Sequence, residues 1–323
     1  MADSPATNKK KNPLSDGQGN LAALLISPTM AVILFVVGIP ILMSLREAVF
    51  RTSTGVDPNT GLITGGESFV GLQNFTDIFA NPSLVQGNWG NIDRLLNAFA
   101  NTTFFTIICV VLETILGVAM ALIMAKAFKG KGVVRAAILV PWAIPTIVSA
   151  KMWGLIFAGD GVMNRVIGQE ILWLADGPQS MWAIIIADVW KTAPFIGLLT
   201  LAGLQTIPGE VYEAAKVDGA SAWQQFTRIT LPMVKPALVV AVLFRTLDTM
   251  RMFDLPAGMI GFGKYFVETV STLAYVENNN LRYGSAAAYS IILFLYIVFI
   301  AFLFVKLLGA DVVVHSMTKY LGG

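Results

Sequence analysis

The chain has 323 residues, of which 55% are hydrophobic and 13% are charged, and its mean hydropathy is +0.69. A soluble domain carries about 25% charged residues, so this composition indicates an integral membrane protein. The net charge of +2 gives no electrostatic support to nucleic-acid binding. The single cysteine, Cys109, and the single histidine, His315, exclude an internal disulfide and leave no plausible His/Cys metal site.

The N-terminal segment is polar and contains three consecutive lysines, so we expect residues 1–20 to form a disordered cytosolic tail. The apolar run that follows continues for about 25 residues, which exceeds the apolar region of a signal peptide, and it lacks a convincing small-residue cleavage site. We therefore expect a retained membrane helix that begins a transmembrane domain over residues 21–323.

Six apolar segments are long enough to cross the hydrocarbon core, which is about 30 Å thick and needs roughly 20 helical residues. They cover residues 22–46, 98–125, 134–157, 181–204, 233–255 and 285–308. The sequence therefore predicts an all-α membrane protein with six transmembrane helices.

The distribution of Lys and Arg predicts the orientation of these helices. With the N-terminus inside, the inner segments carry twelve basic residues and the outer segments carry six. The strongest signal is the segment 126–135, which has four basic residues in ten. We therefore expect both termini and the loop 205–232 to be cytosolic, and the outer loop 50–97 to be long enough for a small cap.

The loop 205–232 is unusually polar and carries helix-capping signals. Pro208 suits the first turn of a helix, and Gly219 suits a left-handed cap at its end, about ten residues later. Ser221 followed by Gln224 is a capping-box pattern that starts a second helix. The sequence predicts two short rigid helices, which either bind another protein or simply stabilise the loop.

Ionisable side chains inside membrane spans are costly and usually functional. The fourth and fifth spans carry six of them: Asp188, Lys191, Arg245, Asp248, Arg251 and Asp254. With a helical rise of about 1.5 Å per residue, the charged residues of the fourth span and those of the fifth span lie at the same depth, at or just outside the membrane midplane. We expect Arg245 and Asp248 to face a cavity, with Asp254 near the outer mouth and on the opposite side of its helix from Arg245. Glu113 and Lys151 are interpreted as packing partners, with lining of the path as their alternative. For the charges of the fourth and fifth spans, salt bridges that fix helix packing or the partner interface remain the alternative.

The spacing within residues 213–232 resembles the EAA loop of ABC importer permeases. It reads Glu213-Ala214-Ala215, three residues, Gly219, nine residues, Ile229, one residue and Leu231-Pro232. The segments "LQTIPGEVYEAA" (204–215), "DGAS" (218–221) and "GSAAAYSIILFL" (284–295) resemble the carbohydrate-uptake branch, which includes maltose-, trehalose-, multiple-sugar- and glycerol-3-phosphate-type permeases. The resemblance implies the type I ABC importer permease fold, in a prokaryotic cytoplasmic membrane.

The resemblance also implies partners for this chain. They are a second, homologous but non-identical permease subunit, two cytosolic ATPase subunits or domains, an extracytoplasmic substrate-binding protein and the lipid bilayer. ATP and Mg would bind to the ATPase, because this chain has no phosphate-loop motif, and we expect no cofactor or enzymatic activity here. The residues implied to contact the ATPase are Glu213, Ala214, Ala215, Asp218 and Gly219.

A substrate path is likewise implied, by alignment on Pro194 and Phe253. Its residues are Asp188, Lys191, Thr192, Phe195, Arg245, Asp248, Thr249 and Met252. Charged groups beside an aromatic ring suit sugar hydroxyls and the apolar face of a sugar, which favours a disaccharide such as trehalose or maltose. A glycerol-3-phosphate-type permease and a secondary transporter driven by an ion gradient remain alternatives, although the sequence has no evident inverted repeat or pair of broken helices.

Overall fold

The structure is a computed structural model that describes residues 13–56, 63–80 and 82–309. Seven longer helices form its frame: α1 (Pro13–Ile33), α2 (Ile39–Val49), α4 (Arg94–Ala125), α5 (Lys131–Ala143), α8 (Pro178–Leu204), α11 (Leu231–Met250) and α14 (Tyr283–Phe304). The shorter helices are α3 (Gln73–Ala80), α6 (Thr146–Ile156), α7 (Val162–Ile167), α9 (Gly209–Val217), α10 (Ala222–Gln225), α12 (Asp254–Met259) and α13 (Val270–Asn279). Three π-helical turns, η1 (Leu34–Gly38), η2 (Phe226–Thr230) and η3 (Val305–Gly309), continue neighbouring helices.

The predicted N-terminal tail lies outside the described residues as far as residue 12. Helix α1 begins at Pro13, inside the segment expected to be disordered. The first long apolar segment therefore runs through α1, η1 and α2 as one helical element that ends at Val49.

Residues 50–97 contain more than the expected loop. Strand β1 (Phe50–Val56) pairs antiparallel with β2 (Ile63–Phe69), and β3 (Leu84–Gly87) pairs antiparallel with β4 (Gly90–Asp93). Gly90 has a φ of +88°, which suits the tight turn between β3 and β4. The all-α prediction is thus right for the helical frame and wrong for this segment, which combines α3 with two hairpins.

Within the described residues, five helical segments are long and apolar enough to cross a membrane. They are Leu21–Val49, Arg94–Ala125, Pro178–Leu204, Ala222–Met250 and Tyr283–Leu307. The segment predicted as a span over residues 134–157 is not one continuous helix, because α5 and α6 meet at an angle of 94°. Counting this bent pair as a single span gives six.

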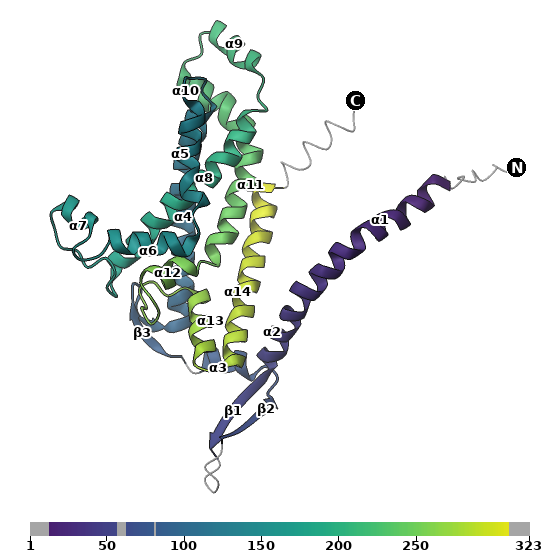
Figure 1. Cartoon of the computed structure of the whole chain (residues 1–323), viewed down its shortest axis with the longest axis vertical. Helices are drawn as coiled ribbons and strands as arrows, with labels where there is room; N and C mark the ends of the chain where they lie inside the picture. The colour runs from purple at the N-terminus through teal and green to yellow at the C-terminus, as the bar shows by residue number, and fades with distance from the viewer. Residues whose placement is uncertain (1–12, 57–62, 81, 310–323) are drawn as a thin grey trace, which may run out of the picture.

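Proline explains the bend between α5 and α6. Pro145 has extended backbone angles, φ −55° and ψ +138°, and lacks the N–H that would continue the ladder of hydrogen bonds. Helix α5 alone rises about 20 Å, which is short of the hydrocarbon core of about 30 Å. Figure 1 shows α6 running sideways from the vertical helices towards α7.

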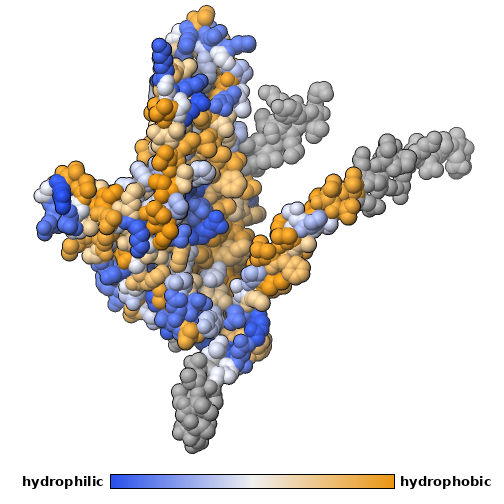
Figure 2. Space-filling view, viewed as in Figure 1, coloured by the Kyte–Doolittle hydropathy of each residue, from blue (hydrophilic) through white to orange (hydrophobic). Residues whose placement is uncertain are grey.

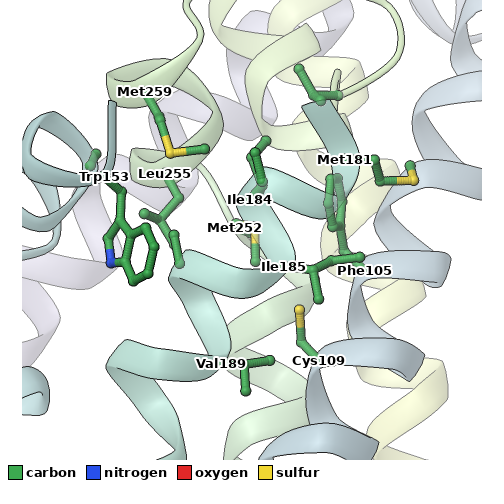
Figure 3. Close-up of a cluster of buried hydrophobic side chains, with 14 of the residues drawn as sticks. Phe105, Cys109, Trp153, Met181, Ile184, Ile185, Val189, Met252, Leu255 and Met259 are labelled. Carbon is green, nitrogen blue, oxygen red and sulfur yellow. The ribbon is translucent and has the colours of Figure 1, made fainter. Parts of the chain in front are cut away.

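Helices α4 and α8 pack closely together and, with α11, form the centre of the bundle. At Gly117 on α4 an added Cβ would lie 2.8 Å from Ile196 and 2.9 Å from the backbone nitrogen of Gly197, so the two backbones approach closely. Cys109 is fully buried in an apolar cluster with Phe105, Ile184 and other side chains (Figure 3). This cluster fixes the parts of α4 and α8 that carry the charged residues.

Helix α1 leaves the bundle, whereas α2 packs against α14 and α3. None of the residues in the most apolar stretch of Leu21–Val49 is buried. Figure 1 shows α1 extending away from α11 and α14, and Figure 2 shows that its surface is mostly hydrophobic. The chain therefore exposes an apolar helix that a bilayer or another apolar helix must cover.

Polar contacts at the end of the bundle near β3 hold the chain that follows α11. The side-chain amides of Asn97 and Asn101 donate to the Tyr265 carbonyl at 2.8 and 2.9 Å. The Thr269 hydroxyl donates to the Met252 carbonyl at 2.9 Å. The turn between α11 and α12 is thereby attached to α4 and α13, which sets the position of the charged groups described next.

Candidate functional site: a charged cavity and a capped loop

The loop between α8 and α11 has the predicted local structure. Pro208 precedes the nine-residue helix α9, and Gly219 has a φ of +76° after its last turn. The Ser221 backbone N–H donates to the Gln224 side chain at 2.7 Å, and the Gln224 backbone N–H donates to the Ser221 hydroxyl at 3.3 Å. The predicted caps are thus confirmed, but the second helix is not a separate short one, because α10, η2 and α11 continue as a single helix over Ala222–Met250. Figure 1 shows α9 and α10 at one end of the bundle.

The outer surface of this loop is both polar and apolar. Glu213, Ala214, Asp218 and Gly219 are exposed, whereas Ala215 is buried and faces the loop itself. The expectation that both alanines form one accessible face is therefore wrong for Ala215. The sequence reasoning gave no weight to Val217, which is 88% exposed, or to the exposure of Trp223, which reaches 71%.

The loop is also held to the bundle. The hydroxyls of Tyr212 on α9 and Thr230 at the start of α11 lie 3.0 Å apart. The Ala220 backbone N–H donates to the Ala215 carbonyl at 2.9 Å and closes the turn after α9. These contacts make α9 move with the root of α11 rather than independently of it.

Arg245 on α11 is the centre of a buried ion cluster. Its guanidinium donates to Glu113 on α4 at 2.6 and 3.0 Å, and to Asp248 at 2.8 Å, and it also pairs with Asp188 on α8. Arg245, Glu113 and Asp188 are each at most 4% exposed. Three helices therefore share one cation, and the shared level predicted for α8 and α11 is confirmed.

A cavity of about 340 Å³ lies beside this cluster, between α8 and the end of α11. Asp188, Lys191, Arg245 and Asp248 line it. Lys191 is 7% exposed and forms no ion pair or hydrogen bond with the described residues. Its ammonium group is consequently available to a ligand in the cavity.

The path of the chain after α11 corrects one prediction. Helix α11 ends at Met250, a turn follows at Arg251, and α12 begins at Asp254. Both Asp254 and Arg245 therefore line the same cavity, although a continuous helix would have pointed them to opposite sides. Figure 3 shows Met252 within the buried apolar cluster, and it also forms part of the cavity wall.

The remaining predicted path residues differ in their surroundings. The Thr192 hydroxyl is bound to Glu113 at 2.5 Å, and the Thr249 hydroxyl donates to the Arg245 carbonyl at 2.8 Å. Phe195 stacks on Trp142 of α5 with ring centroids 6.0 Å apart, beside a smaller cavity of about 250 Å³ that Arg245 and Asp248 also line. All eight predicted residues thus border one or both neighbouring cavities.

The interpretation of Glu113 as a packing partner is confirmed, because it is fully buried and pairs with Arg245 between α4 and α11, but the sequence did not identify this partner. Glu113 is an acidic residue in the middle of the second apolar span, and an isolated charge of this kind indicates a buried partner of opposite charge. Cys109, Glu113 and Asp188 could together offer ligand atoms to a metal ion within 4.8 Å of one another. However, Arg245 already pairs with both carboxylates and supplies the positive charge that they require.

Comparison with known proteins gives relatives that match almost the whole chain. The family described as "Binding-protein-dependent transport system inner membrane component" matches residues 113–314. The trehalose/maltose transport system permease protein of Thermococcus litoralis is 36% identical over 305 residues, which cover 93% of this chain and 97% of the relative. The trehalose transport system permease protein of Mycobacterium tuberculosis is 36% identical over 293 residues, which cover 90% of this chain and 89% of the relative.

Two further similarities extend the comparison. The sulfoquinovosyl glycerol transport system permease protein of Agrobacterium fabrum is 33% identical over 288 residues, which cover 84% of this chain and 85% of the relative. A bacterial ABC transporter described as importing the acidic polysaccharide alginate has a chain of the same fold, with a TM-score of 0.71 and 22% identity, over 90% of this chain and 97% of that one. The chain therefore belongs to the binding-protein-dependent transport system inner membrane components, in the carbohydrate-uptake branch of the ABC transporter permeases.

Proposed function

We propose that this chain is one of two permease subunits in an ATP-driven importer of a sugar, most simply a disaccharide such as trehalose or maltose. The observation that carries the proposal is the cavity beside Arg245. Charged groups that form several hydrogen bonds lie there next to the rings of Trp142 and Phe253, which is the chemistry that suits sugar hydroxyls and an apolar sugar face. The relatives from Thermococcus litoralis and Mycobacterium tuberculosis, which are trehalose/maltose and trehalose permeases, support the same substrate class.

The proposed partners follow from the exposed surfaces. Helices α1 and α2 expose an apolar surface that suits a second, homologous permease subunit in a heterodimer, together with the bilayer. The capped loop 205–232 suits two cytosolic ATPase subunits or domains, which would bind ATP and Mg. Glu213, Ala214, Asp218 and Gly219 are the contact residues on that loop, and Ala215 supports them from beneath.

We further propose six spans, with the bent pair α5 and α6 counted as one, and both termini in the cytosol of a prokaryote. The basic segment 126–135 joins α4 to α5 at the end of the bundle where α9 and α10 lie, which supports a cytosolic position for both. The hairpins, α3 and α13 would then face outwards, towards a substrate-binding protein. Residues 21–323 are the proposed permease domain, preceded by a cytosolic tail over residues 1–20.

The proposed mechanism is alternating access. ATP binding closes the ATPases and moves the two coupling loops, and because α9 is tied to the root of α11, the motion reaches the cavity. Arg245 holds α4, α8 and α11 together at that level, so a change in the angle of α11 changes the cavity wall. Hydrolysis then returns the cavity to its inward-open state.

The test is sugar uptake by proteoliposomes that contain the complete complex, with ATP inside and the binding protein outside. We expect ATP-dependent accumulation of trehalose or maltose, and no accumulation by this chain alone under a proton or sodium gradient. Uptake by the chain alone without ATP would instead establish the secondary transporter. If the complex instead preferred glycerol 3-phosphate, the chain would still be an importer subunit, but the proposed sugar substrate would be wrong.

A further inference from the structure

An apolar groove lies on the other side of α8 from the charged cavity. It has a volume of about 570 Å³, within the range of roughly 300–1,000 Å³ that is usual for ligand pockets. Helices α4, α5 and α8 form its walls, for example through Leu116, Ala137 and Ile186. Its lining side chains are apolar except for the indole N–H groups of Trp182 and Trp190.

The groove exists because α5 approaches α4 at one end. There the Arg135 guanidinium donates to the Met124 carbonyl at 2.6 and 3.0 Å and thereby satisfies an open carbonyl near the end of α4. Farther from this contact, α5 lies along α8 and carries the small Ala137, so the space between the three helices is not filled by side chains. The groove is open at the surface, where Leu116 is 43% exposed and Trp182 is 48% exposed.

Three lysines lie beyond the groove lining, where α4 connects to α5. Lys126, Lys129 and Lys131 lie in and beside the short connection between the two helices, and all three are exposed. Their side chains form no ion pair or hydrogen bond with the part of the chain that the structure describes. The neighbouring Arg135 is occupied by the Met124 carbonyl, so these lysines are the basic groups available to an outside anion.

The distances along the helices are close to the thickness of the headgroup layer of one membrane leaflet. Met120, at the end of the groove on α4, is five residues or about 8 Å from Ala125, where that helix ends. Ala137 on α5 is six residues or about 9 Å from Lys131. The headgroup layer lies within roughly 5–8 Å of the hydrocarbon core, so an acyl chain in the groove would bring its phosphate to the lysines.

We propose that this groove is a binding site for one anionic phospholipid, with an acyl chain between α4, α5 and α8 and the phosphate at Lys126, Lys129 and Lys131. A basic cluster at the cytosolic end of an apolar cleft between membrane helices is the arrangement that recognises anionic headgroups. An apolar helix of the partner permease would fill the groove but would not use the three charges. The proposed lipid site requires only that the groove and the three lysines lie in the same membrane leaflet. It does not depend on which cargo the complex transports.

The test uses the delipidated complete complex, titrated with dioleoyl phosphatidylglycerol or dioleoyl phosphatidylcholine and analysed by native mass spectrometry. We expect the first phosphatidylglycerol to bind more tightly than the first phosphatidylcholine. Each basic group near a membrane surface contributes about fivefold in affinity, so the double change Lys129→Gln/Lys131→Gln should weaken phosphatidylglycerol binding roughly 20- to 30-fold. Binding of phosphatidylcholine should not change.

The matched control is the double change Lys235→Gln/Lys306→Gln, which removes two basic residues from the same end of the bundle but away from the groove. It should leave both affinities as they were. The change Ala137→Trp fills the groove and should weaken the binding of both lipids. Equal affinities for phosphatidylglycerol and phosphatidylcholine would overturn the proposal. An equal loss of phosphatidylglycerol affinity in the control and in Lys129→Gln/Lys131→Gln would also overturn it, as would an Ala137→Trp complex that assembles and binds both lipids normally.

Discussion

At the scale of single residues, the charged cluster combines a structural role and a binding role. Arg245 pairs with Glu113, Asp188 and Asp248, so its charge is fully used within the protein. Lys191 borders the same cavity and has no such partner among the described residues. We infer that Arg245 mainly organises the site, whereas Lys191 is the cation that reaches the cargo.

The first prediction concerns Arg245→Met. This change leaves the buried carboxylates of Glu113 and Asp188 without their cation, and breaking a buried pair in this way costs about 3–5 kcal/mol. We expect a large loss in the free energy of unfolding, measured by titration with SDS in mixed micelles. Arg251→Met is the control, because the Arg251 side chain is 70% exposed and its pair with Asp248 is worth about 1 kcal/mol or less. Equal effects of the two changes would contradict the assigned role.

The second prediction concerns Lys191→Met. Because Lys191 supports no ion pair among the described residues, its removal should leave the unfolding transition of the complex nearly unchanged. Loss of a charged hydrogen-bond donor to the cargo should raise the KM for sugar uptake roughly tenfold or more. Lys151→Met, at an exposed lysine on α6 that does not line the cavity, should leave KM unchanged. A normal KM in Lys191→Met would remove this residue from the binding site.

At the scale of helices, the close approach of α4 and α8 decides how rigid the site is. Gly117 lies one turn beyond Glu113 on α4, and it faces Ile196 and Gly197 on α8. A side chain at this point would push apart the two helices that carry Glu113 and Asp188. The geometry of the ion cluster therefore depends on a glycine that carries no charge.

The third prediction concerns Gly117→Ala. The new Cβ would lie 2.8 Å from Ile196 and 2.9 Å from the Gly197 backbone nitrogen, and overpacking of this kind costs typically 1–3 kcal/mol. We expect a lower unfolding temperature together with slower uptake. Gly132→Ala on α5 is the control, because nothing lies within 4 Å of its added Cβ, and we expect it to be neutral or slightly stabilising. A stable, fully active Gly117→Ala protein would show that the contact is not needed.

The sequence correctly predicted those structural elements that depend only on residues adjacent in the chain. The capping box at Ser221 and the left-handed Gly219 were predicted correctly because caps depend on a few adjacent residues. The bend at Pro145 was missed because the prediction for residues 134–157 used hydropathy, which does not report the direction of a helix. The position of Asp254 was also missed, because the end of α11 at Met250 is fixed by tertiary contacts such as the Thr269 bond to the Met252 carbonyl.

At the scale of the whole molecule, the chain has the surfaces of a subunit rather than of an independent transporter. The apolar helix α1 stands away from the bundle, and the capped loop 205–232 exposes Val217 and Trp223 at its end. Apolar side chains exposed on a rigid, capped element favour a protein partner. The central claim is that this loop transmits the action of a separate ATPase to the cavity beside Arg245.

The most direct measurement of that claim is sugar uptake and ATP hydrolysis by the reconstituted complex carrying Gly219→Pro. Proline fixes φ near −65°, whereas Gly219 has a φ of +76° and donates its N–H to the Lys216 carbonyl at 3.1 Å. Gly209→Pro is the matched control, since the first turn of α9 accepts proline. We predict that Gly219→Pro assembles in the membrane but loses uptake and stimulation of the ATPase by the binding protein, while Gly209→Pro keeps both. Normal uptake by Gly219→Pro would contradict the account.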